Sequence, residues 1–514
     1  MRRLALLALL SLLAAALVAG CGSGAKQPAT LTPASALFYG EVELNPEGGQ
    51  KAAVDALARK FPGSGDAGQR LSRLIEDSLR EKDAKISFEN DVKPWLGDRA
   101  AFFATNPGRA GPTQDSPAAA LIATEDEEAA LSTVQKSQGQ GTEAEYEGVE
   151  YRRFGGSDEV AGVIDGYLVL SNERGLKAVV DAQNNDRALE SSDRFKRALE
   201  GQPKERLGFS YVDVRAAFDA VPSSQAQFLA PFRRAFRDPV VATATAQPDA
   251  LEVTSKTPES SLSALGLAGL GSQGSDLIGR LPGDSIFATG GPDLGRQLNA
   301  GVDLAASSVG GRAILEQGLR ARTGLDLQQD ILGWMGDYGL FVRGQDQSSL
   351  GGALVVESTD PAATRRAIAG FQRILRSQAG SDLRIGRLGV RGAEAGFTLN
   401  SSDLPRPVNV LLADDRFVVA FGDEAANAAI DPQGTLAGES NFSQAQRSLG
   451  GGYKVSAYAS VPAALLLAEG LGSGSDSDFQ RAKPYLTVLG ALVGGAKPAG
   501  NGQLESKFRL TVPG

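Results

Sequence analysis

The chain contains few side chains that could carry out chemistry. It has no histidine among its 514 residues, and its one cysteine is Cys21. Ser-His-Asp and Cys-His catalysis need an imidazole, and Cys/His zinc sites need several thiolate or imidazole ligands, so these classes of site are excluded. A disulfide within the chain is excluded as well. Carboxylates remain, and a carboxylate-based hydrolase stays open as a third hypothesis behind two non-catalytic ones.

The two most distinctive carboxylates lie in a motif that occurs twice, in residues 91–103 and residues 330–342. Each copy contains the run Trp-Leu/Met-Gly-Asp, and the chain has no other tryptophan. The matched residues are Trp95, Gly97 and Asp98 in the first copy and Trp334, Gly336 and Asp337 in the second.

This motif has a functional and a structural interpretation. As a functional site, Asp98 and Asp337 would make polar contacts at a mouth between a helix and a strand. As a structural element, a short helix would end at a glycine in the left-handed conformation, and the aspartate would cap the reversal into a strand. The tryptophan would fix that helix against the sheet. We favour the structural interpretation because each residue then has a local role.

Other acidic and glycine-rich segments point to no cofactor. Residues 125–128 (Glu-Asp-Glu-Glu) could bind Ca²⁺ through oxygen ligands, but acids also stabilise a helix N-terminus through its dipole. Residues 269–274 match G-x-G-x-x-G, but no predicted strand precedes them, so we interpret them as a flexible linker. The sequence therefore predicts no catalytic residue, no metal and no cofactor.

The N-terminus indicates export. Residues 1–20 begin with Met-Arg-Arg and continue with Leu and Ala over the length of a signal-peptide apolar segment, which is shorter than a membrane span. Residues 17–21 (Leu-Val-Ala-Gly-Cys) resemble the lipobox of bacterial lipoproteins. The resemblance implies that the Cys21 thiol carries a diacylglycerol, with residues 21–32 as a flexible tether to the extracytoplasmic face of the cell membrane. An ordinary secretory leader is the alternative.

The elements around the motif repeat in the same order in both halves. Thr124 and Asp360 are predicted to cap the helices that follow the motif. Strands joined by short turns predict antiparallel pairing. We therefore predict an α+β fold made by tandem duplication, in which each half is a mainly antiparallel twisted sheet with helices packed on one face. The predicted repeats are residues 33–258 and 281–514, with a joint at 259–280. One continuous sheet formed by both halves is the alternative.

Three features together resemble the family called domain of unknown function 3352. They are the paired Trp-Leu/Met-Gly-Asp motif, the lipoprotein leader, and the Pro-x-x-x-Leu/Ile-Phe opening of each half at residues 33–38 and 282–287. This resemblance implies an exported or membrane-attached bacterial protein of the cell envelope. It implies no activity and no catalytic residue.

The net charge of -9 argues against nucleic acid, and against long-range attraction to an anionic membrane surface. The leading hypothesis is a lipid-anchored extracytoplasmic protein that is not an enzyme. It would bind an apolar small molecule or an envelope protein through a cleft in or between its halves. A structural or interaction protein of the cell envelope, without a small ligand, is the alternative.

Overall fold

The computed structural model describes two compact units. The boundary between them falls within one strand, after Ser255. Cys21, the signal peptide and most of the predicted joint lie outside the described residues. No described helix is long and apolar enough to cross a membrane. The described residues are 27–62, 76, 86–105, 116–155, 158–184, 187–219, 236, 238–258, 274–308, 311–378, 382–500 and 502–513.

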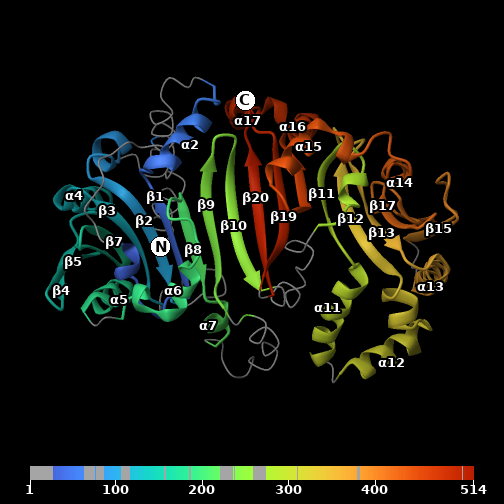
Figure 1. Cartoon of the computed structure of the whole chain (residues 1–514), viewed down its shortest axis with the longest axis horizontal. Coiled ribbons are helices and arrows are strands. Elements are labelled where there is room, and N and C mark those ends of the chain that lie inside the picture. Colours follow the sequence, from blue (N-terminus) through green and yellow to red (C-terminus); the bar gives the residue numbers. More distant parts are fainter. Residues whose placement is uncertain are drawn as a thin grey trace. The chain divides into compact units, whose positions relative to one another are not determined.

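The first unit contains strands β1 to β10 in its described part (Figure 1). Their bounds are β1 Phe38–Glu43, β2 Leu96–Ala104, β3 Ala118–Thr124, β4 Thr142–Tyr146, β5 Val149–Phe154, β6 Glu159–Ile164, β7 Tyr167–Asn172, β8 Gly208–Val212, β9 Val240–Gln247 and β10 Ala250–Pro258. The helices are α2 Gly48–Ala58, α4 Glu127–Gln138, α5 Glu173–Asn184, α6 Asp193–Leu199 and α7 Val214–Asp219, with short turns η1 Pro28–Thr30, η2 Phe88–Val92 and η3 Leu189–Ser191.

Strand neighbours in the first unit are not always neighbours in sequence. The order across the sheet is β10-β9-β8-β1-β2-β3-β7-β6-β5-β4. Each pairing whose register is known is antiparallel, as predicted. The long connection between β3 and β7 contains α4 and the β4–β5 hairpin, so the hairpin extends the sheet beyond β6.

Helices pack on both faces of the first sheet, so the prediction that they cover one face is wrong. All residues of β3 are buried. Leu121 faces a cluster that includes Val179 of α5, whereas Ile122 faces a second cluster that includes Val134 of α4. The sequence of β3 does not alternate apolar and polar residues, and strands of this kind are buried on both faces.

The second unit has strands β11 to β20 in the order β20-β19-β18-β11-β12-β13-β17-β16-β15-β14, with antiparallel pairing throughout. The strands are β11 Ser285–Gly291, β12 Met335–Arg343, β13 Gly351–Ser358, β14 Leu383–Gly386, β15 Ala395–Ser401, β16 Val408–Ala413, β17 Arg416–Phe421, β18 Lys454–Ser460, β19 Ala491–Gly500 and β20 Gln503–Thr511. The helices are α11 Leu294–Ser308, α12 Arg312–Thr323, α13 Pro361–Gln378, α14 Asp423–Ile430, α15 Ser440–Ser448, α16 Val461–Gly470 and α17 Ser477–Leu486, with turns η4 Ile278–Arg280, η5 Leu327–Leu332, η6 Leu436–Gly438 and η7 Ser473–Ser475.

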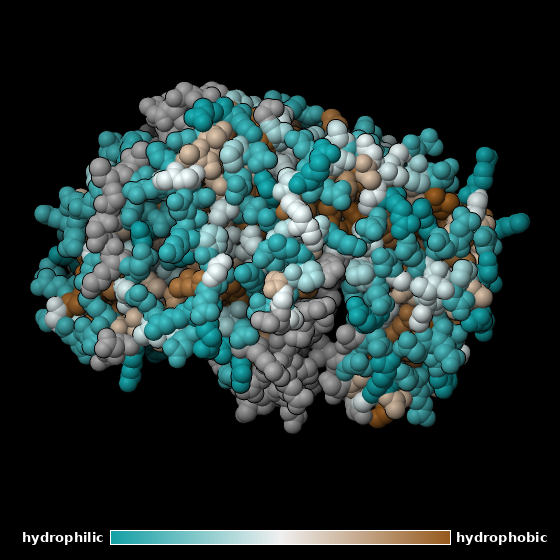
Figure 2. Space-filling model, viewed as in Figure 1, coloured by the Kyte–Doolittle hydropathy of each residue, from teal (hydrophilic) through white to brown (hydrophobic). Residues whose placement is uncertain are grey.

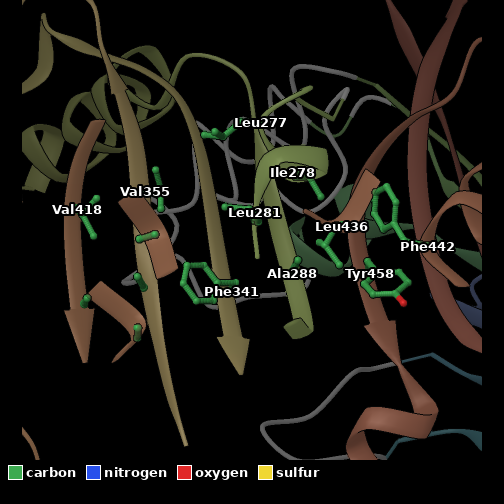
Figure 3. Packing of buried hydrophobic residues seen from close by; sticks show 14 of the residues in the cluster. Leu277, Ile278, Leu281, Ala288, Phe341, Val355, Val418, Leu436, Phe442 and Tyr458 are labelled. Atoms are coloured by element: carbon green, nitrogen blue, oxygen red, sulfur yellow. The ribbon is translucent and has the colours of Figure 1, made fainter. Parts of the chain in front are cut away.

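The second sheet is also covered on both faces. On one face, Phe341 and Val355 of the sheet belong to the same hydrophobic cluster as Phe442 of α15, and Figure 3 shows Leu281, Ala288 and Leu436 between them. On the other face, Val356 packs with Ile368 of α13. Each unit is therefore a layer of antiparallel strands between helices, and the strands follow the same order in both units.

Candidate functional site

Both tryptophans of the repeated motif are buried within their own unit. Trp95 is 4% exposed and Trp334 is 1% exposed. The indole N–H of Trp95 donates to the main-chain oxygen of Asp91 at 2.6 Å, and that of Trp334 donates to the main-chain oxygen of Asp330 at 3.0 Å. The Trp334 ring also packs edge-to-face on Phe417, with 5.0 Å between ring centroids. Each tryptophan therefore holds the preceding turn, η2 or η5, against the sheet.

The first aspartate of each motif copy supports the same turn, and sequence reasoning missed it. Asp91 accepts the Ser87 N–H through Oδ2 at 2.8 Å, and Asp330 accepts the Asp326 N–H through Oδ2 at 2.8 Å. The signal was available, because both aspartates lie four residues before the tryptophan. Their equal geometry in two units gives this aspartate a structural role.

The motif glycines are not in the left-handed conformation, so that prediction is wrong. Gly97 and Gly336 lie inside β2 and β12, and neither has a positive φ. They are needed for close packing instead. A Cβ atom on Gly97 would lie 2.9 Å from main-chain and side-chain atoms of Ala123, and one on Gly336 would lie 2.9 Å from the main-chain oxygen of Glu357. A larger residue would push the neighbouring strand away.

The second aspartates, Asp98 and Asp337, do not share an environment. Asp98 binds the guanidinium of Arg99 with two contacts of 3.2 Å. Asp337 accepts the Ser275 hydroxyl at 2.5 Å and the Asp293 N–H at 3.2 Å. The cause is a bulge after each tryptophan, which contains one more residue in β2 than in β12. The carboxylates of Asp98 and Asp337 therefore do not occupy equivalent sites in the two units.

A group of charged residues lies in the first unit, which we call the charge cluster: Glu41, Glu43, Asp98, Arg99 and Arg206. Arg206 donates to Oε1 of Glu41, with Nε at 3.2 Å. Arg99 lies 3.8 Å from Oε1 of Glu43 and also binds Asp98. Each carboxylate thus has a guanidinium partner, and three carboxylates face two guanidinium groups.

Two buried tyrosines adjoin the charge cluster. The Tyr39 hydroxyl donates to Oε2 of Glu41 at 2.6 Å. Burial raises the pKa of Tyr39 and of Tyr167 well above the ordinary value, so both phenols remain protonated donors at neutral pH. Burial also raises the pKa of the Glu43 carboxyl. The members of the charge cluster neutralise one another. A carboxylate-based hydrolase would need two carboxylates that are not already paired with cations, and the charge cluster does not provide them.

The second unit has no counterpart of this cluster. Ala288 pairs with Tyr458 as Tyr39 pairs with Tyr211, so Ala288 occupies the place of Tyr39. Two residues further along, Gly290 occupies the place of Glu41. The charge cluster is therefore specific to the first unit.

The second unit instead presents a continuous line of apolar residues across its sheet, which we call the apolar row. Its members are direct cross-strand partners, one from each of ten strands in the described part of the unit. From β20 to β14 they are Leu510, Leu492, Ala459, Phe287, Val342, Gly352, Phe421, Val408, Leu399 and Ile385.

No member of the apolar row is fully buried. Leu492 is 45% exposed, and Leu340, in the next line of residues along β12, is 36% exposed. Figure 2 shows hydrophobic residues, in brown, at the surface over the region of β11 to β17. The matching line of the first unit is interrupted by polar residues, because Asn172 pairs with Glu159 there. At its β14–β15 end the row is covered, since Ile385 and Leu399 pack against the cluster that includes Ile368 of α13. The part of the row from β20 to β16 is the candidate binding surface of the chain.

The described residues contain no group of three or more acidic or cysteine side chains arranged to hold a metal ion. In the acidic run at residues 125–128, Asp126 accepts the Ala129 N–H at 2.9 Å and so caps α4. Asp126, rather than the predicted Thr124, is the cap residue.

The model of one protein family, described as "Protein of unknown function (DUF3352)", matches residues 4–469. The chain belongs to this family. The match includes the motif copies and both openings that carried the resemblance. No curated protein sequence matches this DUF3352 member.

Among solved structures, this DUF3352 chain is similar to TP0453. Crystal form IV of TP0453 matches at 8% identity, with 46% of this chain and 81% of TP0453 covered, and a TM-score of 0.24. Crystal form I matches at 9% identity over 46% and 79% of the two chains, with a TM-score of 0.23. A likeness of this degree establishes neither a shared fold nor a shared function.

Proposed function

We propose that this protein is a lipid-anchored, extracytoplasmic, non-catalytic protein that binds an apolar small molecule along the apolar row of its second unit. The observation that carries the proposal is the row itself. Soluble proteins seldom expose large contiguous apolar patches unless these bind something. Covering such surface recovers about 25 cal/mol for each Å² removed from water.

The dimensions of the apolar row favour an extended hydrocarbon ligand. Neighbouring strands are about 4.8 Å apart, so the part of the row from β20 to β16, which crosses eight strands, is roughly 34 Å long. A compact ligand would leave most of the row in water, whereas one or two extended acyl chains would cover much of it. The row contains two small members, Ala459 and Gly352, so its surface is not uniformly filled by side chains.

Membrane attachment through Cys21 belongs to the same proposal. The lipobox-like residues 17–21 and membership of the family support it. A diacylglycerol supplies two acyl chains, and two chains are enough for stable anchoring where one is not. The protein would then remain at the extracytoplasmic face of the cell membrane, close to a source of hydrocarbon ligands.

A tandem duplication is the third part of the proposal. The identical strand order of the two units and the repeated Trp-Gly-Asp motif support it. The apolar row occurs in the second unit and the charge cluster in the first, so the two copies would have taken different roles after duplication. The second unit would bind the ligand.

Native mass spectrometry of the protein extracted from its own membrane tests the proposal. We expect a co-purifying apolar small molecule. A protein partner in place of a small molecule would favour an envelope interaction protein instead. One observation favours that second candidate: α16 contains no buried residue, and its Leu466 is 53% exposed.

A variant of the row gives the sharper experiment. Leu492→Glu places a carboxylate on the row, while Ile314→Glu makes the same kind of change on α12, where Ile314 is 57% exposed. Burial of an unpaired carboxylate under a ligand is unfavourable. We expect Leu492→Glu to weaken binding of a long-chain polyene fatty acid at least about tenfold, or about 1.4 kcal/mol, with Ile314→Glu unchanged. Equal affinity of the two variants, both folded by circular dichroism, would refute the assignment to the row.

A further inference from the structure

The segment from α13 to β15 in the second unit carries a strong positive charge. Residues 360–401, which we call the basic module, contain seven arginines, no lysine and three acidic residues, a net charge of +4. The corresponding segment of the first unit, residues 126–154, runs from the cap of α4 to the end of β5. It contains three basic and seven acidic residues, a net charge of -4. The same pair of elements has therefore acquired opposite charge in the two units.

All seven arginines of the basic module are exposed. Arg365 pairs with Glu394, and Arg366 lies 4.0 Å from Asp330. The other five make no ion pair with any residue that the structure describes. These five are Arg373, Arg376, Arg384, Arg387 and Arg391. The module thus has several guanidinium groups whose charge no neighbouring carboxylate neutralises.

The placement of these arginines follows from the elements that carry them. Ala363, Ala367 and Ile368 face the core from α13, so the arginines occupy the opposite, outer side of that helix. Arg384 lies on β14, which pairs only with β15 among the described strands. Charged residues at a sheet edge prevent unwanted strand pairing, but that purpose needs only a few charges of either sign. It does not account for seven charges of one sign, which repel one another.

The chemistry of the module favours a diffuse phosphate-rich partner. A guanidinium group binds two phosphate oxygens at once, which an ammonium group does not do. A specific protein interface would need large apolar anchors at its centre. Among the described residues of the module, no large hydrophobic side chain is exposed.

We propose that the basic module binds the headgroups of anionic phospholipids at the membrane surface. The choice of a lipid surface rests on the proposed membrane anchoring, which places the chain beside such headgroups. The overall net charge of -9 argued against this partner, but screening limits each charge to about 8–10 Å at physiological salt. Within that range, the local charge of +4 decides the interaction.

Vesicle binding of the mature chain, residues 21–514 with Cys21→Ser, tests this inference without any acyl anchor. We expect sedimentation with vesicles of phosphatidylglycerol and phosphatidylcholine, and little with phosphatidylcholine alone. Binding should weaken steeply as salt rises. The triple variant Arg366→Gln, Arg373→Gln, Arg376→Gln, all on α13, should lower the partition coefficient on the order of 100-fold, since each basic residue near an anionic surface contributes about fivefold.

The matched control is Arg296→Gln, Arg447→Gln, Arg481→Gln, which removes the same charge from exposed positions outside the module. It should lower binding far less. Equal binding to both vesicle types, or equal effects of the two triple variants, would overturn the proposal. Sedimentation velocity tests whether the chain self-associates. If it does, and if the variant Glu127→Gln, Glu145→Gln, Glu150→Gln abolishes self-association, the basic module binds the acidic segment of a second copy of this chain, and the proposal is wrong. The vesicle experiment uses a chain without an acyl anchor, so its result does not depend on lipid attachment at Cys21. Lipid anchoring and headgroup binding by the basic module can therefore be refuted independently.

Discussion

Substitution of Gly336 by alanine and by asparagine separates close strand packing from a left-handed turn. Gly336 lies inside β12, where a Cβ atom would be 2.9 Å from the Glu357 main-chain oxygen and 3.3 Å from Cγ2 of Thr359. The Thr359 methyl can move aside. The Glu357 oxygen belongs to the adjacent strand, so it can move only if the strand moves.

The expected magnitude follows from this geometry. Forcing extra atoms into a packed interior typically costs about 1–3 kcal/mol, and Gly336→Ala should fall in that range. Asparagine puts more atoms into the same space, so Gly336→Asn should be destabilised more than Gly336→Ala. A left-handed glycine would give the reverse order, because asparagine tolerates that conformation better than alanine does.

Tryptophan fluorescence makes the measurement specific to one unit. The chain has two tryptophans, so Trp95→Phe leaves Trp334 as the only reporter, and it lies in the second unit. Urea unfolding of each glycine variant would be followed in that background. Gly318→Ala is the matched control, since Gly318 lies inside α12 with nothing within 4 Å of its added Cβ. It should gain roughly 0.5–1 kcal/mol from helix propensity.

The reasoning is refuted if Gly336→Asn is as stable as Gly336→Ala or more stable. In the first unit, Gly97→Ala should be at least as damaging as Gly336→Ala, because three atoms of Ala123 lie 2.9 Å from the added Cβ. A negligible effect at Gly97 would contradict the close approach of β2 and β3.

Two further predictions concern the anchor and pH. Cys21→Ser should move the protein from the membrane to a released or unprocessed form, measured by detergent partitioning, and unchanged partitioning would contradict lipid attachment. Hydrogen bonds from Arg153 and Lys177 lower the pKa of Glu173 from 4.5 to about 2. A carboxyl whose folded pKa is lowered contributes stability above its unfolded pKa and loses that contribution as pH falls through the folded value. The first unit, followed by Trp95 in a Trp334→Phe background, should lose stability from about pH 4.5 to pH 2, and Glu173→Gln should be less stable at pH 7 with a flatter profile. An unaltered profile would show that Glu173 contributes nothing.

Local sequence patterns predicted those features whose cause is local. Asp360 caps α13 as predicted, because its side chain accepts the Ala363 N–H three residues later at 2.9 Å. The conformation of Gly97 and Gly336 was wrong for a related reason. A glycine after a short apolar helix has the same local signature whether it ends the helix or admits a neighbouring strand. The residues that decide between these possibilities are Ala123 and Glu357, and each lies far in sequence from the glycine that it contacts.

The apolar row and the charge cluster could not be predicted in the same way. The row depends on the register of ten strands, and neighbours such as Phe287 and Ala459 are far apart in the chain. In the charge cluster, Glu41 and Arg206 meet only because β1 pairs with β8. Alternation of residues within one strand indicates which side chains share a face, but it does not indicate what lies beside them.

The differences between the two units are concentrated in a few places. The apolar row and the basic module both belong to the second unit, and they meet at β14, where Ile385 is a member of the row and Arg384 is its neighbour. Successive residues of a strand point to opposite faces, so Ile385 packs on the cluster beneath α13 while Arg384 lies on the other face of the sheet. In the first unit, the segment that corresponds to the basic module is acidic, and the line that corresponds to the row contains the polar pair Asn172 and Glu159. Both proposals, the apolar small molecule on the row and the phospholipid headgroups on the basic module, therefore concern the second unit.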